Sequence, residues 1–196
     1  NLQRSGSLFL VKTIFSVVMS LMFIFIVSYN YPFVTIQLTL IDAFTVGLPS
    51  FVLALEPNRD LIRGEFLRNV ITRAIPGAIC VITSVVIAVV FSAITGLSQD
   101  QFSTLCVLLT CVSGVNLVIR LSIPFNYIRV ALLVVILAGL ILGIFVFGPV
   151  FMLVSLTPNM VVLALVAAAF ITVLFNVLFN IALGYERRYL ASFEGE

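Results

Sequence analysis

Residues 130–185 read VALLVVILAGLILGIFVFGPVFMLVSLTPNMVVLALVAAAFITVLFNVLFNIALGY, a stretch without a single charged side chain. A helix needs about 20 mostly apolar residues to cross the hydrocarbon core of a bilayer, so this stretch is long enough for two such helices. Turn-forming residues interrupt it at Gly148-Pro149 and again at Thr157-Pro158-Asn159. The pattern therefore predicts two membrane spans, at 130–147 and 160–183.

The composition of the whole chain agrees with this interpretation. Of its 196 residues, 62% are hydrophobic and only 9% are charged, whereas a soluble domain carries roughly 25% charged residues. Four further charge-poor stretches, at 8–29, 33–55, 74–97 and 102–119, are long enough to span a membrane. The ten-residue alternation that is typical of membrane β-barrels does not occur. We therefore predict an all-α integral membrane protein, with six transmembrane helices in one membrane domain over residues 1–196.

The positions of the basic residues predict the orientation. All ten Lys and Arg residues fall at the same face of the predicted bundle, where the segment 56–73 and the chain ends lie. The opposite connections, near 30–32, 98–101 and 149–159, carry only Asp100. Because cytoplasmic connections are enriched in Lys and Arg, we expect both termini and the loop 56–73 to be cytoplasmic.

Several classes of function are excluded by what the sequence lacks. It contains no histidine, which rules out imidazole-based triads, and its net charge of +2 gives no basic surface for a nucleic acid. Cys80, Cys106 and Cys111 lie in apolar runs, so we interpret them as buried core residues without disulfides or metal. Neither a phosphate-binding loop nor a hydrolase motif is present, and we expect no catalytic residue in the chain.

Asp42 is the strongest candidate for a functional residue, because it is the only carboxylate well inside a predicted span. Thr45 lies one turn further along the same face, followed by Gly47 and Pro49. Proline cannot donate a backbone hydrogen bond, so we expect the helix to kink or unwind there and leave carbonyl oxygens free. Together with a carboxylate and a hydroxyl, these oxygens would suit a hard cation. The alternative is structural, with Asp42 protonated or paired with Lys12.

Other polar positions in the spans are better explained by helix packing. Asn116, Asn176 and Asn180 are of a type that commonly forms hydrogen bonds between membrane helices, and Gln37 precedes Asp42 by about a turn. Gly139 and Gly143 form a GxxxG pattern, which predicts a surface for close helix packing. Thr13 and Ser16 are the corresponding polar residues of the first span.

The second span resembles a known family. Residues 40–49 (LIDAFTVGLP) and 55–60 (LEPNRD) are similar to the sixth transmembrane helix of P-type cation-transporting ATPases, whose calcium pumps carry Asn-x-x-Thr-Asp-Gly-Leu-Pro there. The resemblance implies that the chain is the C-terminal six of ten helices, in a bacterial calcium-pump-like branch in the plasma membrane. The earlier helices and the cytoplasmic ATPase domains, with their ATP and magnesium, would then lie in a longer protein upstream of Asn1.

The resemblance also implies a site. Asp42 takes the place of the liganding Asn of the family and Thr45 matches its Thr, whereas Val46 replaces its liganding Asp and Gly114 stands where calcium pumps have a Glu. Ser16 and Thr13 stand where those pumps have Glu and Asn in the fifth helix. We therefore expect one divalent cation such as calcium, held by Asp42, with Ser16, Thr45 and the backbone near Gly47 and Pro49.

The cytoplasmic loop has two interpretations. It is either a solvated segment beside anionic headgroups or a docking surface, and the resemblance favours contact with the phosphorylation domain. The residues expected to couple are Glu56, Asn58, Arg59, Asp60 and Arg63. Two other functions stay open. The chain could be a self-contained secondary transporter or channel with Asp42 as the coupling carboxylate, or a membrane anchor without transport activity.

Overall fold

The computed structural model describes residues 2–25, 30–56 and 66–194 and is helical almost throughout. The helices are α1 (Leu2–Phe25), α2 (Thr35–Ile41), α3 (Leu48–Leu55), α4 (Phe66–Thr95), α5 (Gln99–Leu121), α6 (Tyr127–Ile141) and α7 (Pro158–Glu194), with π-helical segments η1 (Asp42–Gly47) and η2 (Leu142–Val146). Because α2, η1 and α3 run on without a break, they form one membrane-length helix. The described residues contain no β-strand and six helices that could each cross a membrane, which confirms the predicted fold class.

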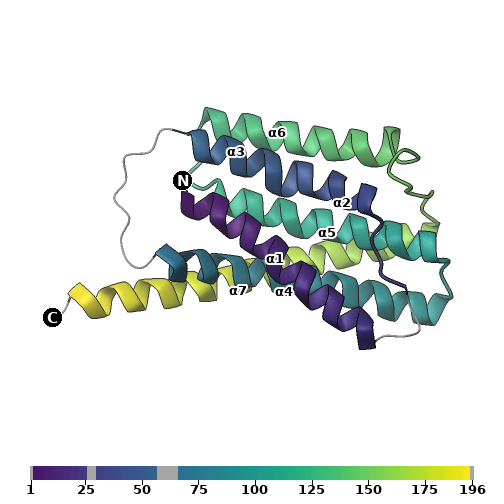
Figure 1. Ribbon diagram of the computed structural model, residues 1–196, viewed down its shortest axis with the longest axis horizontal. Helices are drawn as coiled ribbons and strands as arrows, with labels where there is room; N and C mark the ends of the chain where they lie inside the picture. The colour runs from purple at the N-terminus through teal and green to yellow at the C-terminus, as the bar shows by residue number, and fades with distance from the viewer. Residues whose placement is uncertain (1, 26–29, 57–65, 195–196) are drawn as a thin grey trace.

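The helices run alternately up and down, so their connections gather at two ends of the bundle (Figure 1). The start of α1, the end of α3, the start of α4 and the end of α7 lie at one end, and the 147–157 connection lies at the other. Arg4, Arg68, Arg73, Arg120 and Arg129 all belong to the first end. This is the arrangement expected if that end faces the cytoplasm.

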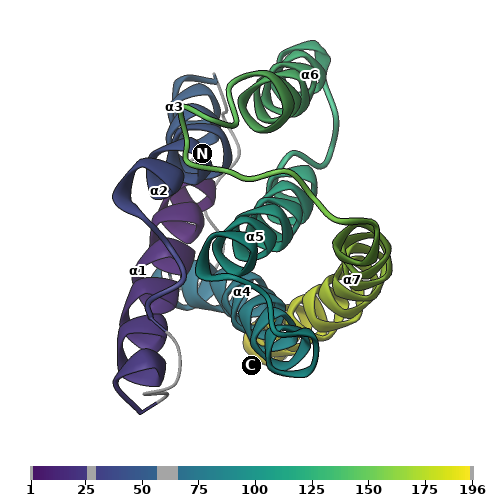
Figure 2. The ribbon, with the colours of Figure 1, turned by 90° about the vertical axis from the view of Figure 1, so that its right-hand side faces the viewer.

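Helix α5 occupies the centre of the bundle, in contact with α2, η1, α4, α6 and α7 (Figure 2). Its side chains include several that are fully buried, among them Phe102, Leu105 and Leu109. Its start is fixed by Ser98, whose side chain accepts a hydrogen bond from the backbone N–H of Gln101 while the Gln101 side chain bonds the Ser98 N–H. The central helix therefore provides a common wall for the elements around it.

At the arginine-rich end, helices α4 and α7 are longer than the predicted hydrophobic spans. Residues 66–73, which we assigned to the loop 56–73, form the first two turns of α4, and this part of the prediction was wrong. The charges of Arg68 and Arg73 mark where the chain leaves the hydrocarbon, but a helix can continue into water because its backbone hydrogen bonds are internal. For the same reason α7 continues well beyond residue 183.

Candidate functional site

The helix that carries Asp42 changes from α-helical to π-helical geometry at that residue. The N–H of Leu48 donates to the carbonyl of Ala43, five residues back, instead of to that of Phe44. Pro49, which would be the next π-helical donor, has no N–H, so neither residue supplies a hydrogen bond to the Phe44 carbonyl. The helix therefore widens without unwinding, and our expectation of an unwound segment is replaced by a π-helical turn. Such turns occur frequently at functional sites.

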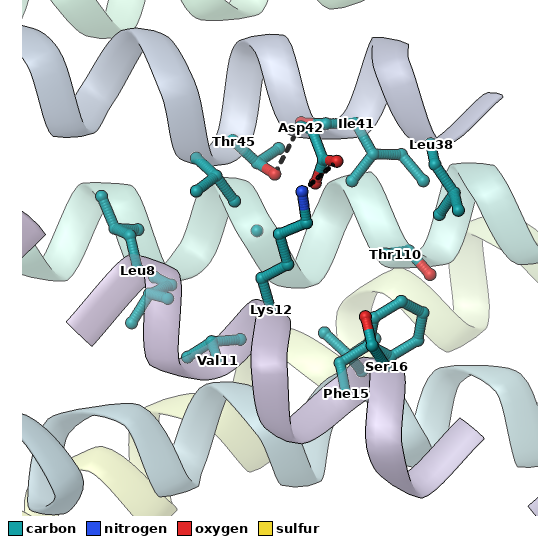
Figure 3. Close-up of a pocket in the computed structure, with 14 residues that line it drawn as sticks. Leu8, Val11, Lys12, Phe15, Ser16, Leu38, Ile41, Asp42, Thr45 and Thr110 are labelled. Atoms are coloured by element: carbon teal, nitrogen blue, oxygen red, sulfur yellow. Dashed lines mark hydrogen bonds and ion pairs between the residues drawn. The ribbon is translucent and has the colours of Figure 1, made fainter. Parts of the chain in front are cut away.

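Asp42 forms an ion pair with Lys12 of α1, as Figure 3 shows. The Nζ of Lys12 lies 2.6 Å from the Oδ2 of Asp42, and the two side chains are 46% and 31% exposed. The ammonium group therefore occupies one oxygen of the only intramembrane carboxylate that the sequence predicted. This geometry is that of the structural alternative considered above, and any cation that approached Asp42 would compete with Lys12.

A cavity of about 60 Å³ lies beside this ion pair, between α1, the α2–η1 segment and α5. Besides Lys12 and Asp42, its polar lining consists of the hydroxyl side chains of Ser16, Thr45 and Thr110. A single water needs roughly 10–15 Å³ of such volume, so the cavity can hold an ion with a few waters. The structure thus places Asp42, Thr45 and Ser16, three of the residues proposed as cation ligands, around one cavity. Gly47 and Pro49 do not line this cavity and shape the helix beside it.

Thr110 is a polar residue of this cavity that sequence reasoning missed. Its side chain is buried, and its Oγ1 makes no hydrogen bond with any part of the chain that the structure describes. The Oγ1 of Thr45, by contrast, donates to the Ile41 carbonyl at 2.8 Å. A buried hydroxyl without a partner costs free energy, so Thr110 favours an occupant that can form hydrogen bonds. Its position four residues before Gly114, on the same face of α5, was the available signal.

Gly114 determines how closely α5 approaches the π-helical segment. A Cβ atom placed on Gly114 would lie 2.7 Å from the Cβ of Thr45, which is closer than side chains can pack. Gly114, which by the resemblance stands where calcium pumps have a Glu, therefore allows Thr45 to contact α5. On the other side of the segment, Gly139 faces Phe44 and Gly143 faces Leu40 in the same way, so the GxxxG pattern is a helix-packing surface.

The described residues contain no cluster of His, Cys, Asp and Glu side chains that could hold a metal by itself. Divalent cations such as calcium take six to eight oxygen ligands, and the cavity supplies one carboxylate and three hydroxyls. These oxygen donors suit a hard cation, but they are too few to fill its coordination shell. A bound cation would need further ligands from water, free carbonyls or other segments.

Several of the remaining polar residues of the spans connect helices within the described part of the chain, but Asn180 and Thr13 do not. Asn116 donates to the Oγ1 of Thr172 at 3.0 Å, and Arg120 donates to the Oδ1 of Asn176. Gln37 is buried near the opposite end, where it accepts from Ser103 at 2.7 Å. Asn180 is exposed on α7, and the hydroxyl of Thr13 bonds its own helix at Phe9.

Glu56 is buried in an ion pair that sequence reasoning did not find. Its Oε2 accepts from the Nε of Arg129 at 2.8 Å, and its Oε1 accepts from Asn126, which also caps the start of α6. Burial acts to raise the pKa of the Glu56 carboxyl, but the hydrogen bonds from Arg129 and Asn126 outweigh it and the pKa is lowered. Asn58, Arg59, Asp60 and Arg63, the other residues expected to couple, lie outside the described residues.

Comparison with known proteins defines the class of the chain. It is 36% identical over 141 residues to the probable cation-transporting ATPase exp7 of Streptococcus pneumoniae, an alignment that covers 68% of this chain and 18% of that protein. It is also 30% identical over 145 residues to the calcium-transporting ATPase CtpE of Mycolicibacterium smegmatis, and 28% identical over 146 residues to CtpE of Mycobacterium tuberculosis, covering 67% of this chain and 18% of each relative. No family profile and no solved structure matches the chain.

A bundle of six membrane-length helices with an ion pair inside it defines a multi-pass membrane protein. Its relatives show that the chain belongs to the P-type cation-transporting ATPases, as a membrane segment of that family. The chain spans less than a fifth of the length of the curated relatives it matches.

Proposed function

We propose that this chain is the membrane part of an ATP-driven cation pump in which Asp42 is the anionic ligand of the transported ion. The observation that carries the proposal is the position of Asp42. Its carboxylate lies at the start of a π-helical turn, beside a small cavity with three hydroxyl side chains, in a chain whose relatives are named as cation-transporting ATPases.

The site would have two states, one in which Lys12 is paired with Asp42 and one in which a cation is bound there. With its ammonium group at 2.6 Å, the carboxylate is neutralised and binds an incoming cation weakly. A cation that bound Asp42 would have to displace the ammonium, because two positive charges at one carboxylate repel each other. The 46% exposure of the Lys12 side chain leaves it free to swing away along α1. The pair would thus keep the carboxylate compensated whenever no cation is bound.

The energy for transport would come from parts of the complete protein that are outside this chain. ATP and magnesium would act in its cytoplasmic domains, and movement there would tilt α1 and the α2–η1–α3 helix while α4 to α7 serve as a scaffold. The segment that begins at Glu56 would carry the contact, since its first residue is fixed to α6 through Arg129. Calcium is our proposed ion, because two of the relatives are named as calcium-transporting.

Vanadate-sensitive ATP hydrolysis by the complete gene product in liposomes tests the proposal. We expect one cation of a panel to stimulate hydrolysis, and Asp42→Asn to abolish that stimulation or shift it to much higher concentration. Asp100→Asn, which changes an exposed carboxylate at the opposite end, is the matched control and should leave stimulation unchanged. Absence of hydrolysis with every cation would favour a secondary transporter, and equal stimulation of both variants would assign Asp42 a structural role.

A further inference from the structure

A second cavity, of about 230 Å³, lies at the cytoplasmic end of the bundle and is lined by three arginines from three different helices. Arg4 comes from the first turns of α1, Arg73 from the start of α4 and Arg120 from the last turn of α5. The rest of its lining is apolar and consists of Leu121, Ile123, Phe179 and Leu183. Guanidinium groups and hydrophobic side chains therefore share one small space, which has no lining residue in common with the cavity beside Asp42.

Arg4 donates to the carbonyl of Ile123 at 3.3 Å, and the charges of Arg73 and Arg120 are only partly compensated. Arg73 pairs with Glu186, its Nη2 at 3.0 Å from Oε1, but the Nε of Arg73 is buried and makes no hydrogen bond with the described residues. Arg120 binds neutral groups, since its Nε donates to the Asn176 amide oxygen at 3.0 Å and its guanidinium lies 5.7 Å from the centre of the Phe179 ring. No ion pair between Arg120 and a carboxylate occurs among the side chains that the structure describes.

These features fit a phosphate group better than a metal or a neutral ligand. The planar guanidinium presents several N–H donors in a geometry that matches phosphate oxygens, and arginine is the residue most used for this purpose. An oxyanion would also give the buried Nε of Arg73 an acceptor. Arg73 and Arg120 together face one carboxylate, that of Glu186, and two partly buried positive charges are costly without a further counter-charge.

The location indicates where the phosphate comes from. The three arginines are near the end of the spans that the positive-inside rule assigns to the cytoplasm, and arginine side chains in such positions extend toward the lipid headgroups. Basic pockets between membrane helices on this side are typical sites for anionic lipid headgroups. Phe179 and Leu183 lie on α7, an outer helix of the bundle, and could meet the adjoining glycerol and acyl groups.

We propose that Arg4, Arg73 and Arg120 form a binding site for a phosphate group, supplied by an anionic phospholipid of the inner leaflet. The site is independent of the cation site and of the pump assignment. Its occupant would hold α1, α4 and α5 together at the end of the bundle where α1 begins.

The test is lipid retention by the complete gene product in phosphatidylcholine nanodiscs that contain phosphatidylglycerol, measured by native mass spectrometry. We expect phosphatidylglycerol to be retained in preference to phosphatidylcholine. A basic side chain near a membrane surface contributes about 1 kcal/mol to the binding of an anionic lipid, so Arg120→Gln should weaken retention about fivefold. Arg73→Gln, on a different helix, should give a similar loss.

Arg68→Gln is the matched control, because Arg68 lies on α4 at the same end and does not line the cavity. It should weaken retention much less than Arg120→Gln, and equal losses in the two variants would overturn the proposal. Arg120→Lys keeps the charge and should retain most of the binding. A parallel titration with inorganic phosphate in phosphatidylcholine alone identifies the source. If inorganic phosphate binds and Arg120→Gln removes that binding, but phosphatidylglycerol is not preferred, the lipid assignment is overturned. If neither phosphate nor phosphatidylglycerol binds, the site itself is overturned.

Discussion

At the scale of single residues, the arrangement of Asp42 and Lys12 decides how the site would work. A carboxylate inside a membrane span is costly unless it is compensated, and here the compensating group is an ammonium from the neighbouring helix. A cation that bound Asp42 would take over this compensating role, so the cation and the ammonium compete for one carboxylate.

Replacing Lys12 with Met should therefore strengthen cation binding. Even an ion pair in water is worth up to about 1 kcal/mol, so removal of this competitor inside a span should lower the cation concentration for half-maximal hydrolysis at least about fivefold. Lys12→Arg keeps the positive charge and should leave that concentration close to the wild-type value. A higher half-maximal concentration in Lys12→Met would mean that Lys12 assists binding instead of competing.

The ion pair of Glu56 with Arg129 should make the stability of the protein sensitive to acid. The pKa of Glu56 is lowered from its ordinary 4.5, so the pair stabilises the fold fully above that value and loses its contribution as the pH falls through the lowered pKa. Glu56→Gln leaves the Arg129 charge buried and should cost about 3 kcal/mol at neutral pH. Thermal unfolding in detergent between pH 7 and pH 3 should show wild type losing more stability than Glu56→Gln, and parallel pH profiles would contradict this.

Sequence reasoning named residues that lie together at one cavity, but not the contacts that they make. Asp42 and Thr45 could be predicted because a charged group is rare in a span and their spacing puts them on one face. The contact of Asp42 with Lys12 could be considered only as an alternative, because it depends on the rotation of α1 against η1. Thr110 and Arg129 were missed because their roles depend on which helices are neighbours, which a single sequence does not reveal.

At the scale of elements, glycines determine how closely the α2–η1–α3 helix packs against its neighbours. Gly114 on one side and Gly139 with Gly143 on the other let Thr45, Phe44 and Leu40 approach the neighbouring backbones. The GxxxG pattern could be predicted to pack, but its partner could not. The π-helical turn could not be predicted either, since Pro49 only removes a donor and the surrounding packing decides whether the helix kinks or widens.

Gly114→Ala should destabilise the protein by about 1–3 kcal/mol, because the added methyl group would overlap Thr45 and force the helices apart. Gly184 is the matched control, since a Cβ there meets no atom within 4 Å and alanine is favoured over glycine in a helix. Thermal unfolding should show a lower midpoint for Gly114→Ala and an unchanged or higher one for Gly184→Ala. Equal midpoints would show that the contact is easily relieved.

At the scale of the whole molecule, the alternation of six helices and the grouping of arginines at one end predict that both termini are cytoplasmic. The natural Cys80, Cys106 and Cys111 are buried, so single added cysteines can report the topology. A membrane-impermeant maleimide applied to intact cells should label Ser155→Cys and spare Phe125→Cys, both of which are exposed positions. The reverse pattern would invert the orientation.

Six spans could be counted from hydropathy alone, because a bilayer fixes the length of apolar sequence that each helix requires. The residues at which the helices end outside the membrane could not be predicted, as α4 and α7 show. Charge marks the membrane boundary but does not terminate a helix. The central position of α5 could not be predicted either, because its small and polar residues resemble those of any packed membrane helix.

The central claim is that Asp42 binds the transported cation, and direct binding of that cation to the complete gene product tests it without relying on ATP hydrolysis. The measurement is equilibrium binding of radioactive calcium to purified wild type, Asp42→Asn and Asp100→Asn. The account predicts saturable binding that Asp42→Asn weakens at least tenfold and Asp100→Asn leaves unchanged. Binding of the same affinity in wild type and Asp42→Asn would contradict it and leave the Lys12–Asp42 pair as a structural link between α1 and η1.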